Sequence, residues 1–61
     1  MRDKNRIPKI LKQLEIIWKQ HPDCRLGQLI CNLDNTRDTD VYFMEDIYLI
    51  NALRDLYEIK D

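Results

Sequence analysis

The sequence predicts one all-α domain over residues 1–61, made of a helical hairpin and a third helix, with a short extended segment before that third helix. Three observations predict this fold. Apolar residues recur at the 3.6-residue helical period in three separate stretches. One glycine and two prolines are too few for a flexible linker between domains. Finally, 44% of the 61 residues are hydrophobic, which is enough for a single small core.

The first helix is expected over residues 7–21, because its apolar positions follow the i, i+3, i+4, i+7 rule. They are Ile7, Ile10, Leu11, Leu14, Ile17 and Trp18. Asn5 is expected to cap this helix, which places Pro8 at the third helical position, where its missing N–H costs nothing. Pro22 ends the helix, because the residue before a proline is pushed out of the helical region.

The second helix is expected to be capped by Asp23 and to complete a hairpin with the first. Its apolar stripe is Leu26, Leu29, Ile30 and Leu33. The run from Asp34 to Asp40 has no apolar side chain and is rich in turn formers, so it predicts an exposed loop.

The third helix is expected from Glu45 to about Glu58, with acidic residues at the start, where the helix dipole favours them. Its apolar face is Leu49, Ile50, Leu53, Leu56 and Tyr57. The three residues Val41-Tyr42-Phe43 before it are β-branched or aromatic. They predict an extended lead-in or a short edge pairing.

Charge is sorted along the chain. Residues 1–20 carry six basic and two acidic side chains, a net charge of +4, whereas residues 21–40 and 41–61 carry −2 and −3, so the total is −1. A basic first helix could follow the phosphates of a nucleic acid. Nucleic-acid domains usually have a clearly basic balance, however, so we favour pairing between these side chains and the acidic third helix.

One apolar residue, Ile16, falls in the middle of the polar face of the first helix, among Lys9, Lys12 and Lys19. A lone exposed isoleucine is ordinary on protein surfaces, and this is the interpretation we favour. The functional alternative is a contact point for a partner helix or for a second copy of the chain.

The second helix carries a polar stripe, since Arg25, Gln28 and Asn32 are spaced i, i+3 and i+7. The structural interpretation, which we favour, has these side chains bonding the backbone of the stretch from Val41 to Phe43. The functional interpretation has the stripe facing outward near Trp18, Tyr42 or Tyr48, in the arginine-plus-aromatic mixture typical of interface hot spots.

His21, Cys24 and Cys31 are the soft metal-ligand candidates, and they match no zinc spacing. Nucleophilic catalysis by either thiol would need an orienting group and an enclosed site, which three short helices rarely form. We therefore expect no enzymatic activity, no cofactor and no metal. No apolar run approaches the roughly 20 residues that span a bilayer, and the charged N-terminus is no secretory signal, so a cytoplasmic location is expected.

Several blocks together resemble a family of very short bacterial and phage proteins without a characterised function. The resemblance lies in the Arg6-Ile7 start, in Trp18 followed by Pro22-Asp23-Cys24-Arg25-Leu26-Gly27-Gln28-Leu29, and in Tyr42-Phe43 before Glu45-Asp46. It covers nearly the whole chain, and its middle block is the specific part. The family usually has an apolar residue in place of Cys24, which favours a packed thiol there. The resemblance implies no activity, ligand or catalytic residue.

The residues therefore predict a small non-enzymatic interaction or regulatory protein of the cytoplasm, of phage derivation, that docks on a protein partner. Small size favours function by contact, because a domain this small gains stability when a partner covers it. A homodimer is one form of such a contact. The alternative is a nucleic-acid-associated protein that uses the basic face of the first helix.

Overall fold

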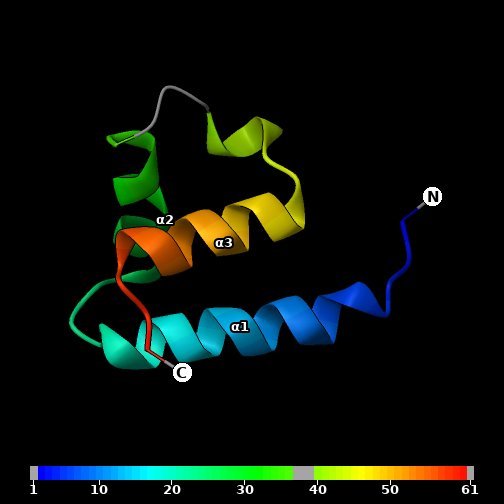
Figure 1. Cartoon of the computed structure of the whole chain (residues 1–61), viewed down its shortest axis with the longest axis horizontal. Helices are drawn as coiled ribbons and strands as arrows, with labels where there is room; N and C mark the ends of the chain where they lie inside the picture. Colours follow the sequence, from blue (N-terminus) through cyan, green and yellow to red (C-terminus); the bar gives the residue numbers. More distant parts are fainter. Residues whose placement is uncertain (1, 37–39, 61) are drawn as a thin grey trace.

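The computed structural model describes residues 2–36 and 40–60, and it confirms the all-α fold. The helices are α1 (Arg6–Gln20), α2 (Leu26–Asp34) and α3 (Asp46–Leu56), and one 3₁₀ turn, η1 (Val41–Phe43), precedes α3. In Figure 1, α1 and α3 lie side by side, α2 rises from the end of α1, and η1 lies on the side of α3 away from α1. The central helix is therefore α3, which packs against both α1 and α2.

Helices α1 and α3 run in the same direction, as Figure 1 shows. The contacts between them keep a nearly constant sequence separation, with Arg6 bonded to Asp46, Gln13 to Arg54 and Gln20 to Lys60. A constant separation is what two parallel helices require, whereas antiparallel helices would give a constant sum of residue numbers. The segment containing α2 and η1 returns the chain to the starting end of α1.

The core is small and is shared by all three helices. Its buried side chains are Ile17 of α1, Leu29 and Leu33 of α2, and Ile50, Ala52 and Leu53 of α3. Each large member contributes about 1.5–3 kcal/mol of transfer free energy when fully buried. Half-buried residues from every element, among them Val41 and Met44, pack around it.

The apolar stripe predicted for the first helix is only partly covered in α1. Ile17 is fully buried, but Ile7, Leu11 and Trp18 are 44%, 57% and 36% exposed. The covered face is rotated toward Arg6, Gln13 and Ile17, because α3 contacts that side. One edge of the stripe therefore stays on the surface.

Helix α2 begins after Arg25 rather than after the predicted cap, Asp23. The residues between the helices form a turn instead, closed by the N–H of Cys24, which donates to the carbonyl of His21 at 3.2 Å. Trp18 Nε1 donates to the carbonyl of Cys24 at 2.7 Å and holds this turn against α1. Asn5 does precede α1 as predicted, with Pro8 third in the helix, but its side chain makes no capping hydrogen bond.

The segment Val41–Phe43 is helical, so the expectation of an extended stretch there is wrong. Extended backbone is confined to its flanks, Asp40, Met44 and Glu45. The carboxylate of Asp34 accepts from the N–H of Val41, and that of Asp40 from the N–H of Tyr42, both at 3.0 Å. Such local side-chain bonds satisfy backbone donors that would otherwise need a partner strand. Residues 37–39 of the predicted loop lie outside the described part of the chain.

Helix α3 ends in a Schellman motif, slightly before the predicted Glu58. The N–H of Ile59 donates to the carbonyl of Arg54 at 3.0 Å, and the N–H of Glu58 to the carbonyl of Asp55 at 3.3 Å. Glu58 has a positive φ of 51°, in the left-handed region that usually holds glycine. The turn brings Ile59 back onto the core.

Candidate functional site

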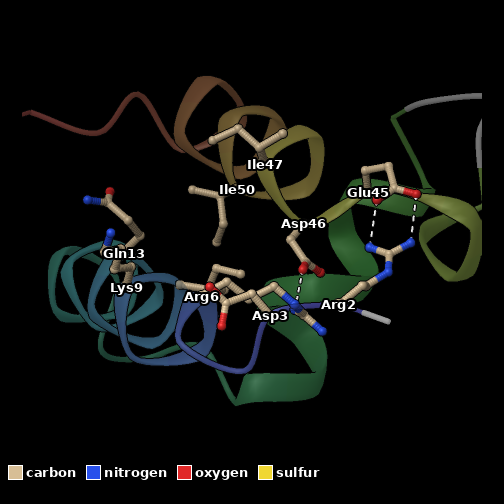
Figure 2. Close-up of a pocket in the computed structure, with 10 residues that line it drawn as sticks. Arg2, Asp3, Arg6, Lys9, Gln13, Glu45, Asp46, Ile47 and Ile50 are labelled. Atoms are coloured by element: carbon tan, nitrogen blue, oxygen red, sulfur yellow. Dashed lines mark hydrogen bonds and ion pairs between the residues drawn. The ribbon is translucent and has the colours of Figure 1, made fainter.

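An open, largely apolar groove lies between the N-terminal halves of α1 and α3 (Figure 2). We call it the α1–α3 groove. Ile10 of α1 and Ile50 of α3 line it, and Ile47 stands on its α3 edge with 70% of its surface exposed. Its volume is about 470 Å³, within the range of sites that take a small ligand or the side chains of a partner.

Two arginine–carboxylate pairs stand at one end of the groove (Figure 2). Arg2 donates from both terminal nitrogens to the Glu45 carboxylate, at 2.6 and 2.9 Å, and Arg6 pairs with Asp46. Glu45 occupies the N-cap position of α3 without a side-chain capping hydrogen bond, and Asp46 is the first residue of the helix, so both carboxylates belong to residues at its positive end. The hydrogen bonds from Arg2, and then its charge, lower the pKa of Glu45 below its ordinary value.

Lys9 and Gln13 form the α1 wall of the groove beyond Arg6, as Figure 2 shows. Gln13 Oε1 accepts a hydrogen bond from Arg54 Nη1 at 3.0 Å, which ties α1 to α3. Among residues 2–36 and 40–60, no carboxylate lies within ion-pair distance of the Lys9 ammonium. Lys9 therefore adds a positive charge to an apolar wall whose arginines are already paired.

The favoured interpretation of the basic first helix, pairing with the acidic third helix, is confirmed for Arg2 and Arg6. Lys12 and Lys19 instead contact Glu15 of the same helix, at 2.8 and 3.6 Å. The hydrogen bond from Lys12, and then the charges of both lysines, lower the pKa of Glu15. Four of the six basic side chains of residues 1–20 thus contact a carboxylate of this chain.

Ile16 is half-buried rather than the centre of an open basic face. The two glutamines that share this face contact α3 and the segment after it. Gln13 bonds Arg54, and Gln20 bonds the backbone N–H and carbonyl of Lys60 at 3.2 and 2.8 Å. Of the basic residues predicted around Ile16, Lys9 alone lines the α1–α3 groove.

Arg25, Gln28 and Asn32, the polar stripe, do not bond the backbone of η1. The prediction that they do is therefore wrong. Asp34 and Asp40 supply those bonds. Gln28 Oε1 accepts from the N–H of Arg25 at 3.0 Å and so caps α2, while Asn32 Nδ2 donates to the Tyr57 hydroxyl at 3.2 Å. Gln28 and Asn32 therefore make hydrogen bonds within the fold, and Arg25 lies exposed at the helix start.

Tyr42 is 83% exposed, and three further side chains around the start of α3 are exposed as well: Phe43 at 75%, Ile47 at 70% and Tyr48 at 63%. The hypothesis of an interaction surface at the polar stripe named Tyr48 but neither Phe43 nor Ile47. Helical periodicity gives a signal for Tyr48, which falls on the opposite side of the third helix from Ile50. Phe43 gives none, because its exposure depends on the 3₁₀ turn.

The three candidate metal ligands, His21, Cys24 and Cys31, are not grouped into a metal site within the part of the chain that the structure describes. His21 Nε2 donates to the carbonyl of Tyr57 at 3.1 Å, and the two rings lie 4.8 Å apart. Cys24 is half-buried against the core, Cys31 is exposed, and both are free thiols. Over the described residues, no three His, Cys, Asp or Glu side chains are grouped so as to hold a metal ion.

Comparison with known protein families, with curated proteins and with solved structures found no match. The resemblance to short bacterial and phage proteins therefore stays a prediction. None of the helices in residues 2–36 and 40–60 is both long and apolar enough to cross a bilayer.

Proposed function

We propose that this protein is a non-catalytic, regulatory interaction protein of the cytoplasm that docks on a protein partner through the α1–α3 groove. One observation carries the proposal: a concave apolar surface, lined by Ile10, Ile47 and Ile50, lies beside the ammonium of Lys9. An apolar centre with a polar rim is the usual anatomy of a protein interface. The two free thiols agree with a reducing compartment.

The groove favours a partner segment with one or two aliphatic or aromatic side chains and a carboxylate about one helical turn away. The apolar side chains would pack on Ile10 and Ile50, each contributing about 1.5–3 kcal/mol when fully buried. The carboxylate would pair with Lys9. An amphipathic helix laid along two helices of its partner is a common form of this contact.

The charges around the groove support binding over catalysis. Glu45 is held by two hydrogen bonds from Arg2, which lower its pKa, so it is ionised at neutral pH and makes a poor general acid. Nucleic-acid binding gains little support, because four basic residues of the N-terminal third already contact Glu15, Glu45 or Asp46.

The test is affinity capture from a bacterial lysate with three forms of the chain: wild type, Lys9→Glu and Lys12→Glu. The two variants make the same change of charge on α1, but Lys9 lines the groove and Lys12 does not. We expect a stoichiometric protein partner with the wild type and with Lys12→Glu, and its loss with Lys9→Glu.

Two results would contradict the proposal. One is the absence of any stoichiometric partner, and the other is capture that Lys9→Glu leaves unchanged. Binding of mixed-sequence DNA or RNA at low salt, weakening steeply as salt is added, would favour the nucleic-acid alternative.

A further inference from the structure

Three highly exposed aromatic side chains lie around the start of α3. They are Tyr42, Phe43 and Tyr48, and we call them the η1–α3 surface. The rings of Tyr42 and Phe43 pack edge to face, with centroids 4.9 Å apart and planes at 80°. Figure 1 places η1 on the side of α3 away from α1, whereas the α1–α3 groove opens between those two helices. Ile47 lines the groove and is not part of the η1–α3 surface.

The backbone forces the two aromatic residues of η1 outward. Val41 and Met44, on either side of them, pack against the core. The carboxylates of Asp34 and Asp40 hold the turn through the N–H groups of Val41 and Tyr42. Tyr42 and Phe43 are thus presented on a fixed turn, so that little side-chain and loop entropy is lost when they are covered.

The area of this surface fits a dimer. The three aromatic side chains expose roughly 330–550 Å², taking about 150–250 Å² for each complete ring system. A standard interface buries about 800 Å² on each partner, of which about 60–65% is apolar. The η1–α3 surface therefore supplies most of the apolar area that each side of such an interface needs.

The charges also suit contact between identical surfaces. A two-fold interface brings the residues at its axis near their own copies, so charged side chains there would repel. The three residues of the η1–α3 surface are uncharged, and three acids close to them in the sequence already have partners within the chain. Asp40 accepts from the N–H of Tyr42, Glu45 pairs with Arg2, and Asp46 pairs with Arg6.

We infer that two copies of this chain associate about a two-fold axis through the η1–α3 surface, with the aromatic side chains of each copy packed against those of the other. The dimer covers the two most exposed large hydrophobic side chains, Tyr42 and Phe43, of a domain whose core has only six buried residues among those described. It leaves the Lys9 wall of the α1–α3 groove uncovered, so this inference does not rest on the proposed function.

The test is the mass of the full chain by sedimentation equilibrium over a range of concentrations. We expect the wild type to shift from 7.5 kDa toward twice that mass as concentration rises. Phe43→Glu places like charges across the axis and should raise the dissociation constant at least about 30-fold, the loss typical of a hot-spot residue. Tyr42→Ser, at the most exposed position, weakens the dimer with little effect on the fold, which circular dichroism checks.

Leu11→Glu is the matched control, because Leu11 is an exposed apolar residue of α1 outside this surface. It should leave the dimer unchanged, as should Lys9→Glu. A wild-type chain that stays monomeric at roughly millimolar concentration overturns the inference. So does a dimer that Leu11→Glu disrupts and Phe43→Glu does not, or a monomer in which Phe43→Glu abolishes capture of a different protein.

Discussion

Replacing Glu58 with glycine should stabilise this protein by about 1 kcal/mol. Glu58 is the one non-glycine residue with positive φ in the described part of the chain. The left-handed conformation costs a residue with a β-carbon about 1–2 kcal/mol, and glycine avoids that cost. The gain is reduced by about 0.4–1 kcal/mol, because glycine has more freedom in the unfolded chain. Both hydrogen bonds of the Schellman motif join backbone atoms and persist in the variant.

Urea and thermal unfolding, followed by circular dichroism, measure the effect. For a domain of about this size, 1 kcal/mol corresponds to an increase of roughly 4–8 °C in the melting temperature. Glu58→Ala is the control, because it removes the carboxylate and keeps the β-carbon. Glu58→Asn should fall between the two, since asparagine tolerates this conformation better than most residues. The reasoning is refuted if Glu58→Ala stabilises as much as Glu58→Gly, or if Glu58→Gly lowers the stability.

Two further predictions concern contacts that join distant segments. Tyr57→Phe should destabilise the fold by about 1–2 kcal/mol in urea titrations, because the hydroxyl donates to the half-buried carbonyl of Leu29 at 2.7 Å. Asn32→Ala leaves that hydrogen bond in place and should destabilise the fold less. Equal losses of stability in the two variants would contradict the importance of the bond from Tyr57 to Leu29. Stability should also fall as the pH drops below about 4.5, the ordinary pKa of glutamate. Arg2 lowers the pKa of Glu45 in the folded state. The contribution of this pair is therefore fully present above the unfolded-state pKa and is lost as the pH falls through the folded-state pKa. Melting temperatures at pH 3 to 6 check this, and an identical slope in Glu45→Gln would show that the pair contributes nothing.

The paired charges explain how a chain with a basic first third can have a near-neutral surface at that end. Arg2 and Arg6 meet Glu45 and Asp46, whose positions at the start of α3 bring them beside the start of α1. This arrangement needs α1 and α3 to be parallel. The basic residues before and at the start of α1 therefore lie beside the acidic residues at the start of α3. Lys9, which lines the groove, has no such acidic partner among the described residues.

The exposed apolar residues of α1 show that helical periodicity alone does not predict which side chains are buried. Leu11 and Ile17 belong to the same predicted stripe, yet Leu11 is 57% exposed and Ile17 is fully buried. A stripe defines which residues could be covered, whereas the rotation of the helix against its neighbours defines which are. Contacts such as Gln13 with Arg54 set that rotation, and they join residues 41 positions apart.

The sequence by itself determined the helices, since helix formation depends on residue spacing within a few turns and on signals such as Pro22 and the acids before α3. It also predicted that basic side chains of the N-terminal third pair with acids at the third helix, which holds for Arg2 and Arg6. Only the tertiary structure decided that α1 packs parallel to α3, that η1 is a 3₁₀ turn, that Glu58 takes a left-handed conformation, and that the η1–α3 surface is left uncovered. The physical reason is that the exposure of side chains and the packing of helices depend on the sum of many contacts between residues far apart in the chain. The local apolar pattern of a helix contains no information about those contacts.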